Sequence, residues 1–387
     1  MITIHTGDAL DQLRAMPDNS VHCVVTSPPY YGLRDYGVEG QMGLEATPAE
    51  FVERLVTVFR EVRRVLAIDG TLWLNMGDSY ATGRSGARDA SRWPRQSRND
   101  HKPLLTMSYD GLKPKDLIGM PWRVAFAMQN DGWWLRQDII WHKPNPMPES
   151  VRDRCAKAHE YIFLLSKSDR YFFDADAIRE RATSDRPAGN KKHKYVHAAP
   201  ESAPESVDHR TKSGLLALSG TAWAERHRRS VWTVASQPFH GAHFAAFPPR
   251  LIEPCIQAGT SERGHCPACG ARWVREMTRT NQVNPSARGS KFDSGKTSSR
   301  NGGDRTQAGE RFLSAATGRW LPTCTHDLAP VPDVVLDPFA GAGTTLMVAA
   351  QHFRDGVGIE INPAYAEMAR QRVRDEGGLG QFLEGGR

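Results

Sequence analysis

Hydrophobic runs and helically spaced apolar residues alternate over the first half of the chain. Short runs rich in β-branched and aromatic residues predict strands at residues 2–5, 21–25, 71–75, 135–141 and 161–165. Apolar residues recur at helical spacing from Phe51 to Leu66, with Pro48 ahead and Gly70 behind as helix boundaries, and Leu117–Met128 forms a second helical pattern. This alternation predicts an α/β fold with a parallel sheet and helices on both faces.

The pattern breaks in the middle of the chain. Residues 82–110 and 175–235 are polar, basic and without clear periodicity, and apolar spacing returns only over residues 244–256. Residues 280–310 are rich in Gly, Ser, Asn and Arg with almost no large apolar side chain. Such a composition is typical of a disordered or mobile segment.

The α/β pattern resumes near the C-terminus and carries the first candidate site. A predicted strand at residues 334–336 runs into Asp337-Pro-Phe339-Ala-Gly341-Ala-Gly343-Thr344-Thr345. Asp337 is then at the carboxyl edge of the sheet, and the glycines let the backbone turn tightly against a ligand. The two threonines are candidate caps of a helix at residues 346–353. The alternative is a tight strand–helix turn without a ligand.

A second strand at residues 356–359 ends in Glu360, and Asn362-Pro363 begins a further helix. A carboxylate at the end of the neighbouring strand is well placed to bind a ribose diol. Leu346 occupies the position three residues after Gly343 where the dinucleotide fingerprint requires glycine. This departure disfavours an NAD or FAD enzyme.

The second candidate site is Thr26-Ser27-Pro28-Pro29-Tyr30, after the strand at residues 21–25. Two prolines make an extended, stiff turn. The Ser27 hydroxyl and the carbonyl of Ser27 or Pro28 are two acceptors that can hold the exocyclic amine of a base, and Tyr30 can stack on a base flipped from a duplex. Taken alone, the motif also fits a rigid loop.

Together the two motifs resemble the amino-methylating DNA methyltransferases of the β class, in which the catalytic half precedes the cofactor half. The segments Gly70–Tyr80, Gly132–Asn145 and His159–Tyr161 also look like parts of this family. The resemblance implies a permuted Rossmann-like methyltransferase fold, S-adenosylmethionine as cofactor and double-stranded DNA as partner.

The resemblance also assigns residues to roles. It implies a catalytic group of Ser27, Pro28, Pro29 and Tyr30. It implies a cofactor-binding group of Asp8, Thr26, Asp337, Phe339, Gly341, Gly343, Thr344, Thr345, Glu360 and Asn362. Asp8 would accept from the adenine amino group of the cofactor, and its alternative role is to cap a helix at residues 9–16.

Ser27 stands where many adenine-N6 members of the family carry Asp or Asn, and serine there goes mostly with cytosine N4. The resemblance therefore favours an enzyme that methylates cytosine N4 in a short duplex site by base flipping. The alternatives are an adenine-N6 methyltransferase and a catalytically silent DNA-binding protein on the same fold. A cognate restriction endonuclease is a candidate partner, and the chain would act as a monomer or homodimer.

Basic segments supply candidate DNA contacts, because Lys and Arg neutralise phosphates and aromatic side chains stack on bases. The candidates are the Arg-rich residues 82–100 with Trp93, and residues 186–230 with Tyr195 and Trp223. The net charge of +6 on 387 residues is a mild bias that permits an anionic partner without proving one.

Cysteine spacing indicates a metal site. Cys266-Pro-Ala-Cys269-Gly is a C-x2-C knuckle, and Cys324-Thr-His326 could complete four tetrahedral ligands of a structural zinc ion. The alternative is four unmetallated side chains in a surface insertion. The remaining residues, Cys23, Cys155 and Cys255, have apolar sequence neighbours and are predicted to be inert core residues.

No disulfide framework is expected from 6 cysteines in a chain of this length. The first ten residues lack the features of a signal peptide, and no apolar run approaches the ~20 residues of a membrane span. We therefore expect a cytoplasmic protein without membrane contact, and the resemblance implies a nucleoid-associated protein of a prokaryote or phage.

The predicted organisation has five parts. They are a catalytic half (1–174), a target-recognition region (175–240), a return to the core (241–262), an insertion with the zinc knuckle and a mobile loop (263–329), and a cofactor-binding half (330–387).

Overall fold

The computed structural model describes residues 1–32, 37–38, 40–81, 111–181, 225–237, 247–283 and 310–378. The Arg-rich segment 82–100, most of the basic region 186–230 and residues 284–309 of the predicted mobile stretch lie outside these ranges. Trp93, Tyr195 and Trp223 lie outside them as well, so the DNA contacts expected there stay predictions.

One 8-stranded sheet forms the body of the protein, in the order β1-β12-β11-β2-β3-β5-β4-β8. The strands are β1 (Ile2–Thr6), β2 (Val21–Thr26), β3 (Leu66–Met76), β4 (Trp134–His142), β5 (His159–Ser166), β8 (Val231–Thr233), β11 (Val334–Asp337) and β12 (Asp355–Glu360). The first strand of the chain pairs in parallel with the last, in a register that runs from Ile2↔Gly356 to Thr6↔Glu360. The C-terminal half therefore completes its sheet with the N-terminal strand, as the permuted arrangement requires.

The sheet is not wholly parallel, which corrects the prediction from strand–helix alternation. β5 runs antiparallel to both of its neighbours, β3 and β4. The 16 residues between β4 and β5 contain no helix, and Pro144, Pro146 and Pro148 interrupt them. A parallel pair needs a long crossover, usually a helix, whereas an antiparallel pair needs only a loop.

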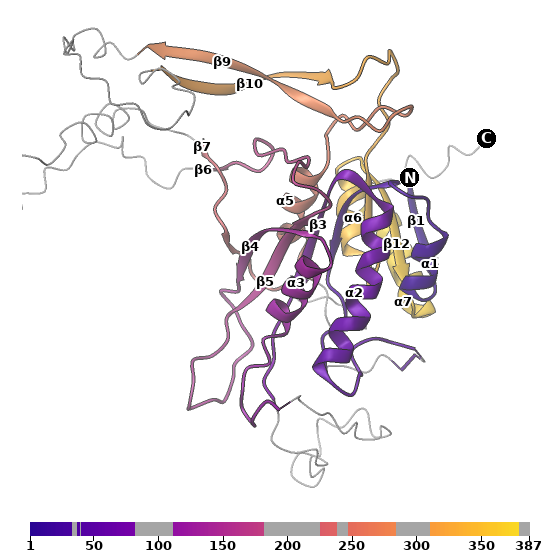
Figure 1. Cartoon of the computed structure of the whole chain (residues 1–387), viewed down its shortest axis with the longest axis vertical. Helices are drawn as coiled ribbons and strands as arrows, with labels where there is room; N and C mark the ends of the chain where they lie inside the picture. Colours follow the sequence, from indigo (N-terminus) through magenta and orange to yellow (C-terminus); the bar gives the residue numbers. More distant parts are fainter. Residues whose placement is uncertain are drawn as a thin grey trace, which may run out of the picture.

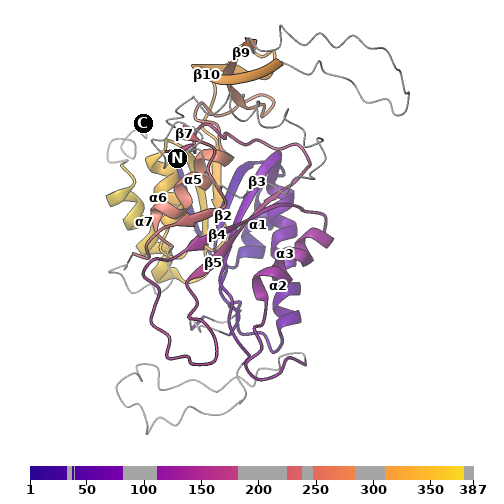
Figure 2. The same cartoon turned by 90° about the vertical axis from the view of Figure 1, so that its left-hand side faces the viewer.

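Helices cover both faces of the sheet, as predicted (Figure 2). The layer on one face contains α1 (Ala9–Ala15), α2 (Pro48–Val65) and α3 (Met120–Asn130). The other layer contains α5 (Pro249–Gly259), α6 (Thr344–Gln351) and α7 (Pro363–Glu376). Each layer buries its own apolar cluster against the sheet, around Phe51 and Phe59 of α2 on one side and Leu251 and Leu346 on the other.

Helix α2 shows how the sequence sets local boundaries. Thr47 and Glu50 form a capping box at its start, and Pro48 occupies the first turn, where its missing N–H costs nothing. Its end is earlier than predicted, because Leu66 already begins β3 and Gly70 lies inside that strand. Leu66 fits the helical spacing of the apolar residues, but it is the first residue of a strand of the sheet.

A two-stranded ribbon extends from the end of the sheet where the N-terminus lies (Figure 1). It consists of β9 (Trp273–Val283) and β10 (Glu310–Pro322), paired antiparallel. Residues 280–283 and 310 were predicted to be part of a mobile stretch, and this is wrong for them. A further short pair joins β6 (Glu180–Arg181) and β7 (Glu225–Arg226). Within the described ranges, no helix is both long and apolar enough to cross a membrane.

Candidate active site

The two sequence motifs line one cavity of about 420 Å³ at the carboxyl ends of the sheet strands. The residues after β2 contribute Ser27, Pro28, Pro29 and Tyr30 to its wall. The turn after β11 contributes Asp337, Phe339, Gly341 and Thr344. Because β2 and β11 are adjacent parallel strands, their carboxyl ends meet at the same edge. The wall also includes Asp8 after β1 and Glu360 at the end of β12.

Asp337 is buried and held on both oxygens. Its Oδ1 accepts from Thr26 Oγ1 at 2.6 Å and from the Phe339 amide at 3.1 Å, and its Oδ2 accepts from Thr345 Oγ1 at 2.7 Å. Burial raises the pKa of Asp337 to about 6, although these three hydrogen bonds oppose the rise. A cationic ligand in the cavity would favour the ionised carboxylate.

Thr26 and Thr345 lie behind Asp337 and do not line the cavity. Both are 0% exposed, and their hydroxyls reach Asp337 from two sides. The expectation that Thr344 and Thr345 cap a helix is wrong, because α6 already begins at Thr344 and Gly343 is its N-cap. The Thr344 hydroxyl instead accepts from Arg372 Nη1 at 2.8 Å.

Glu360 is fixed by two backbone amides. Its Oε2 accepts from Gly341 N and its Oε1 from Asn362 N, each at 2.8 Å. Gly341 has φ +51°, a left-handed conformation that glycine adopts without cost, and this brings its amide to the carboxylate. A carboxylate has about four acceptor positions, so two remain for hydroxyl groups of a ligand. Burial raises the pKa of Glu360 above its ordinary value.

Three further predicted cofactor residues differ in position. Asp8 caps α1, since its Oδ1 accepts from Leu10 N at 2.8 Å, and it also lies on the cavity wall. Asn362 caps α7 with its side chain and is not among the lining residues found in the described chain. Gly343 is likewise absent from this lining, and a Cβ there would lie 2.8 Å from Ala369 Cβ.

A polar cluster surrounds the Tyr30 phenol, and sequence reasoning did not identify it. The Tyr30 hydroxyl lies 2.8 Å from Glu160 Oε2 and 3.4 Å from Asn75 Oδ1. Lys143 forms an ion pair with Glu160, and Asn75 Nδ2 donates to Glu160 Oε2 at 3.4 Å. Burial, and then the charge of Glu160, raise the pKa of Tyr30 well above its ordinary value.

The sequence signal for this cluster was a charged residue, Glu160, beside the apolar run at residues 161–165. Glu160 lies at the start of β5 and Asn75 near the end of β3, which are antiparallel neighbours. The segment around Glu160 resembled the family, yet no role could be given to it without the strand pairing. Trp141 is only 4% exposed and also lines the cavity.

Basic residues near the recognition region are partly engaged within the described chain. Arg226 Nε and Arg229 Nε both donate to Glu180 Oε1, at 2.7 and 3.1 Å. Arg228 lies over the Trp232 ring at 4.6 Å. These intramolecular contacts reduce the number of free cations that residues 225–230 can offer to phosphates.

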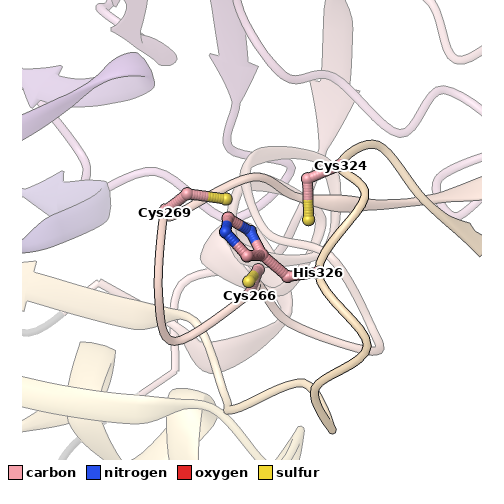
Figure 3. Close-up of side chains that lie close together, drawn as sticks. All are labelled: Cys266, Cys269, Cys324 and His326. Carbon is pink, nitrogen blue, oxygen red and sulfur yellow. The ribbon is translucent and has the colours of Figure 1, made fainter.

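The four predicted metal ligands come together outside the cavity (Figure 3). The sulfur atoms of Cys266, Cys269 and Cys324 and a ring nitrogen of His326 lie within 4.8 Å of one another. Among the other cysteines, Cys23 and Cys255 are buried as predicted, whereas Cys155 is exposed and its prediction as a core residue is wrong.

Comparisons with known proteins agree on one class of enzyme. The DNA methylase family with N6 and N4 specificity matches residues 21–266 and 323–371. The chain is 40% identical to the type II methyltransferase M.XycI of Xanthomonas campestris pv. cyanopsidis over 374 residues, which cover 97% of this chain and 88% of M.XycI. It is 38% identical to the type II methyltransferase M.Cfr9I of Citrobacter freundii, with 97% and 88% covered.

A solved structure shares the fold at low sequence identity. The cytosine-N4-specific PvuII DNA methyltransferase superposes with a TM-score of 0.51 at 15% identity, over 96% of this chain and 86% of that protein.

Proposed function

The chain belongs to the N6/N4 DNA methylase family and is a type II DNA amino-methyltransferase, and we propose that its target is N4 of cytosine in a short duplex site. The observation that carries methyl transfer to an amine is the placement of Ser27-Pro-Pro-Tyr30 and the Asp337–Glu360 pair on the wall of one cavity. The choice of cytosine N4 rests on serine at position 27. The nearest alternative within the family is adenine N6.

The cavity fits S-adenosylmethionine, the cofactor of this class. The cavity volume of about 420 Å³ lies in the range of ~300–1,000 Å³ that is usual for cofactor sites. We propose that Glu360 holds the ribose hydroxyls with its remaining acceptor positions and that Asp337 faces the methionine part. Phe339 and Gly341 would close the pocket, and Asp8 would accept from the adenine amino group. The cofactor supplies an electrophilic methyl group carried by a sulfonium.

Other predicted cofactor residues support the site indirectly. Thr26 and Thr345 keep the Asp337 carboxylate in place through their hydroxyls. The backbone N–H of Asn362 donates to Glu360 Oε1. Gly343 is the N-cap of α6 and has a left-handed conformation, with φ +74°. We propose that these residues position the acids and the turn without touching the ligand.

Ser27, Pro28 and Pro29 would hold the target amine. The Ser27 hydroxyl and the Ser27 or Pro28 carbonyl can accept its two N–H groups, which leaves the nitrogen lone pair free for the methyl group. Tyr30 would stack on the flipped base. Serine in place of Asp or Asn at position 27 is the reason to prefer cytosine N4 over adenine N6, since serine there goes mostly with cytosine N4 in the family.

The proposed target can be tested directly on DNA. Genomic DNA from a host that lacks other methyltransferases and expresses this chain is expected to contain N4-methylcytosine by nucleoside mass spectrometry. The same host with Ser27→Ala is the control and is expected to lack it. If the wild type instead produces N6-methyladenine and the control does not, the enzyme class is kept and the assignment of cytosine as the target base is overturned. Neither modified base at normal expression would favour a catalytically silent protein.

We further propose that a restriction endonuclease recognises the same site, as the type II class of the relatives suggests. Methylation-aware sequencing of the same DNA would define the site. Plasmids that carry this site should then resist the cognate endonuclease only when the active chain is expressed. The proposal that residues 186–230 and 82–100 contact DNA can be tested through the salt dependence of DNA binding.

Glu160 is proposed to position Tyr30 for stacking. Glu160→Gln keeps an acceptor but loses the charge that holds Lys143, and Tyr30→Phe loses only the hydroxyl. Each variant is expected to lower kcat roughly tenfold, since a hydrogen bond to a charged group contributes about 1.5–3 kcal/mol. Because both changes remove the same charge-assisted hydrogen bond between Tyr30 and Glu160, the double variant should be little worse than either single variant. Fully additive losses would show that the two residues act independently.

A further inference from the structure

The base of the β9–β10 ribbon is held by four side chains with the donor set of a zinc site. Cys266 and Cys269 precede β9, and Cys324 and His326 follow β10. The two pairs therefore flank Trp273↔Pro322, the last residue pair of the ribbon. A metal ion at this point would join the two strands at their open end.

The distances between the donor atoms suit a tetrahedral ion. Zinc binds sulfur at ~2.3 Å and nitrogen at ~2.0–2.1 Å, so the donor atoms of a tetrahedral site with three sulfurs and one nitrogen lie roughly 3.5–3.8 Å apart. The four donor atoms here all lie within 4.8 Å of one another. Movements of about 1 Å or less would complete the coordination, and Figure 3 shows the three sulfur atoms and the imidazole converging on one region.

The backbone around the thiols is arranged as in a metal knuckle. The Cys266 amide donates to the Ala271 carbonyl at 2.8 Å, which pairs the two ends of the turn. Gly270 has φ +73° and donates its amide to the Cys266 carbonyl at 2.8 Å, which closes the turn. This turn brings the Cys266 and Cys269 sulfur atoms close together.

The described side chains of the ribbon form no apolar core that could replace a metal. None of the side chains described at residues 273–277 and 317–322 is buried. An isolated two-stranded hairpin is marginally stable at best in water. The described part of the ribbon therefore needs a restraint at its base, and the four converging ligands lie at that position.

On the other side of the ligands, a buried charge cluster attaches the knuckle to the sheet. Asp333, just before β11, accepts from His265 Nδ1 at 3.0 Å and from Ser261 N at 2.7 Å, and it forms an ion pair with Arg272. Arg272 Nη2 also donates to the His22 carbonyl at 3.2 Å. The knuckle thus stands on the amino end of β2 and β11, whereas the cavity lies at their carboxyl ends.

We propose that Cys266, Cys269, Cys324 and His326 bind one structural zinc ion that fastens the ribbon to the amino end of the sheet. The ion joins the two strands of the ribbon at their base. The Asp333–Arg272 ion pair attaches the same region to the amino end of the sheet. Four protein ligands fill a tetrahedral shell, so the site has no open position for catalysis. This inference is independent of which base is methylated.

Elemental analysis tests the site on the full chain purified without chelator. About one equivalent of zinc per chain is expected. Cys269→Ser combined with His326→Ala should lose it, and Cys155→Ser, at an exposed cysteine outside the cluster, should retain it. Zinc that persists in the double variant, iron in place of zinc, or metal-free wild-type protein that takes up no Zn²⁺ would overturn the proposal.

Two measurements keep the test decisive if the double variant does not fold. Wild-type protein exchanged with Co²⁺ should show thiolate-to-cobalt charge-transfer absorption, and its absence would overturn the ligand set. Chelation should speed tryptic cleavage at Arg275 and Arg319 of the ribbon at least about tenfold, because local opening controls access to these bonds. Unchanged cleavage would rule out the fastening role.

Discussion

Replacing Ser27 by alanine is expected to lower turnover by about two orders of magnitude while the affinity for S-adenosylmethionine changes little. Ser27 lines the cavity wall after β2, where its hydroxyl is proposed to accept an N–H of the target amine. Loss of one preorganised hydrogen bond in an enzyme site typically costs about 10²–10³ in kcat. The Asp337 and Glu360 carboxylates, which are proposed to bind the cofactor, keep their partners in this variant.

Single-turnover methylation of duplex DNA and calorimetric titration with S-adenosylmethionine measure the two effects separately. Ser20→Ala is a matched control, because Ser20 precedes β2 at the opposite end and donates to the Pro17 carbonyl at 2.7 Å. It should leave both quantities unchanged. Full activity of Ser27→Ala would remove Ser27 from the mechanism, and an equal loss of cofactor affinity would mean that it shapes the cofactor site instead.

Asp337→Ala is expected to weaken S-adenosylmethionine binding by at least about tenfold. The substitution removes a buried carboxylate that holds the Phe339 amide and the hydroxyls of Thr26 and Thr345. Hydrogen bonds to charged groups contribute about 1.5–3 kcal/mol each, and every 1.4 kcal/mol changes affinity tenfold. Calorimetry, with thermal unfolding measured in parallel, separates lost affinity from lost stability. Unchanged affinity would show that the cofactor is bound elsewhere.

The same carboxylate gives the binding a pH dependence. Burial raises the pKa of Asp337 to about 6, so below that pH the free protein carries a proton on this group. A sulfonium ligand favours the ionised form, and proton and ligand therefore compete. Affinity should be constant above pH 6 and fall as pH drops below it, approaching about tenfold per pH unit.

The Asp337→Asn variant should bind S-adenosylmethionine more weakly at every pH. Its affinity should not show the fall below pH 6. Asp11→Asn, at an exposed acid on α1, is the control and should keep the wild-type profile. A profile that is identical in wild type and Asp337→Asn would assign the dependence to another group, of which Glu360, with its raised pKa, is the first to examine.

The secondary structure near both motifs followed from local sequence. Short apolar runs rich in β-branched residues identified the strand that precedes Ser27 and the strand that ends at Asp337, because this signal depends only on which side chains face a core. Proline and glycine mark the turns for reasons of backbone geometry alone. The same local rules identified the C-x2-C knuckle and the boundary at Thr47-Pro48.

Other features depended on contacts between distant residues. The reversed direction of β5, the pairing of β9 with β10 and the end of α2 at Val65 are decided by which strand lies beside which. Local spacing carries no information on that choice, since one run of apolar residues can pack in either direction. A polar stretch in the sequence could therefore contain the paired ends of a ribbon.

Only the tertiary structure shows which residues line the cavity and which lie behind them. Sequence alone named Asp337, Glu360, Ser27 and Tyr30, because each belongs to a short motif that follows a predicted strand. It could not distinguish Thr26, behind Asp337, from residues that line the cavity, and it gave Glu160 no role. Burial and hydrogen-bond partners are properties of neighbours that lie 130 residues apart for Tyr30 and Glu160 and 311 apart for Thr26 and Asp337, and only folding brings them together.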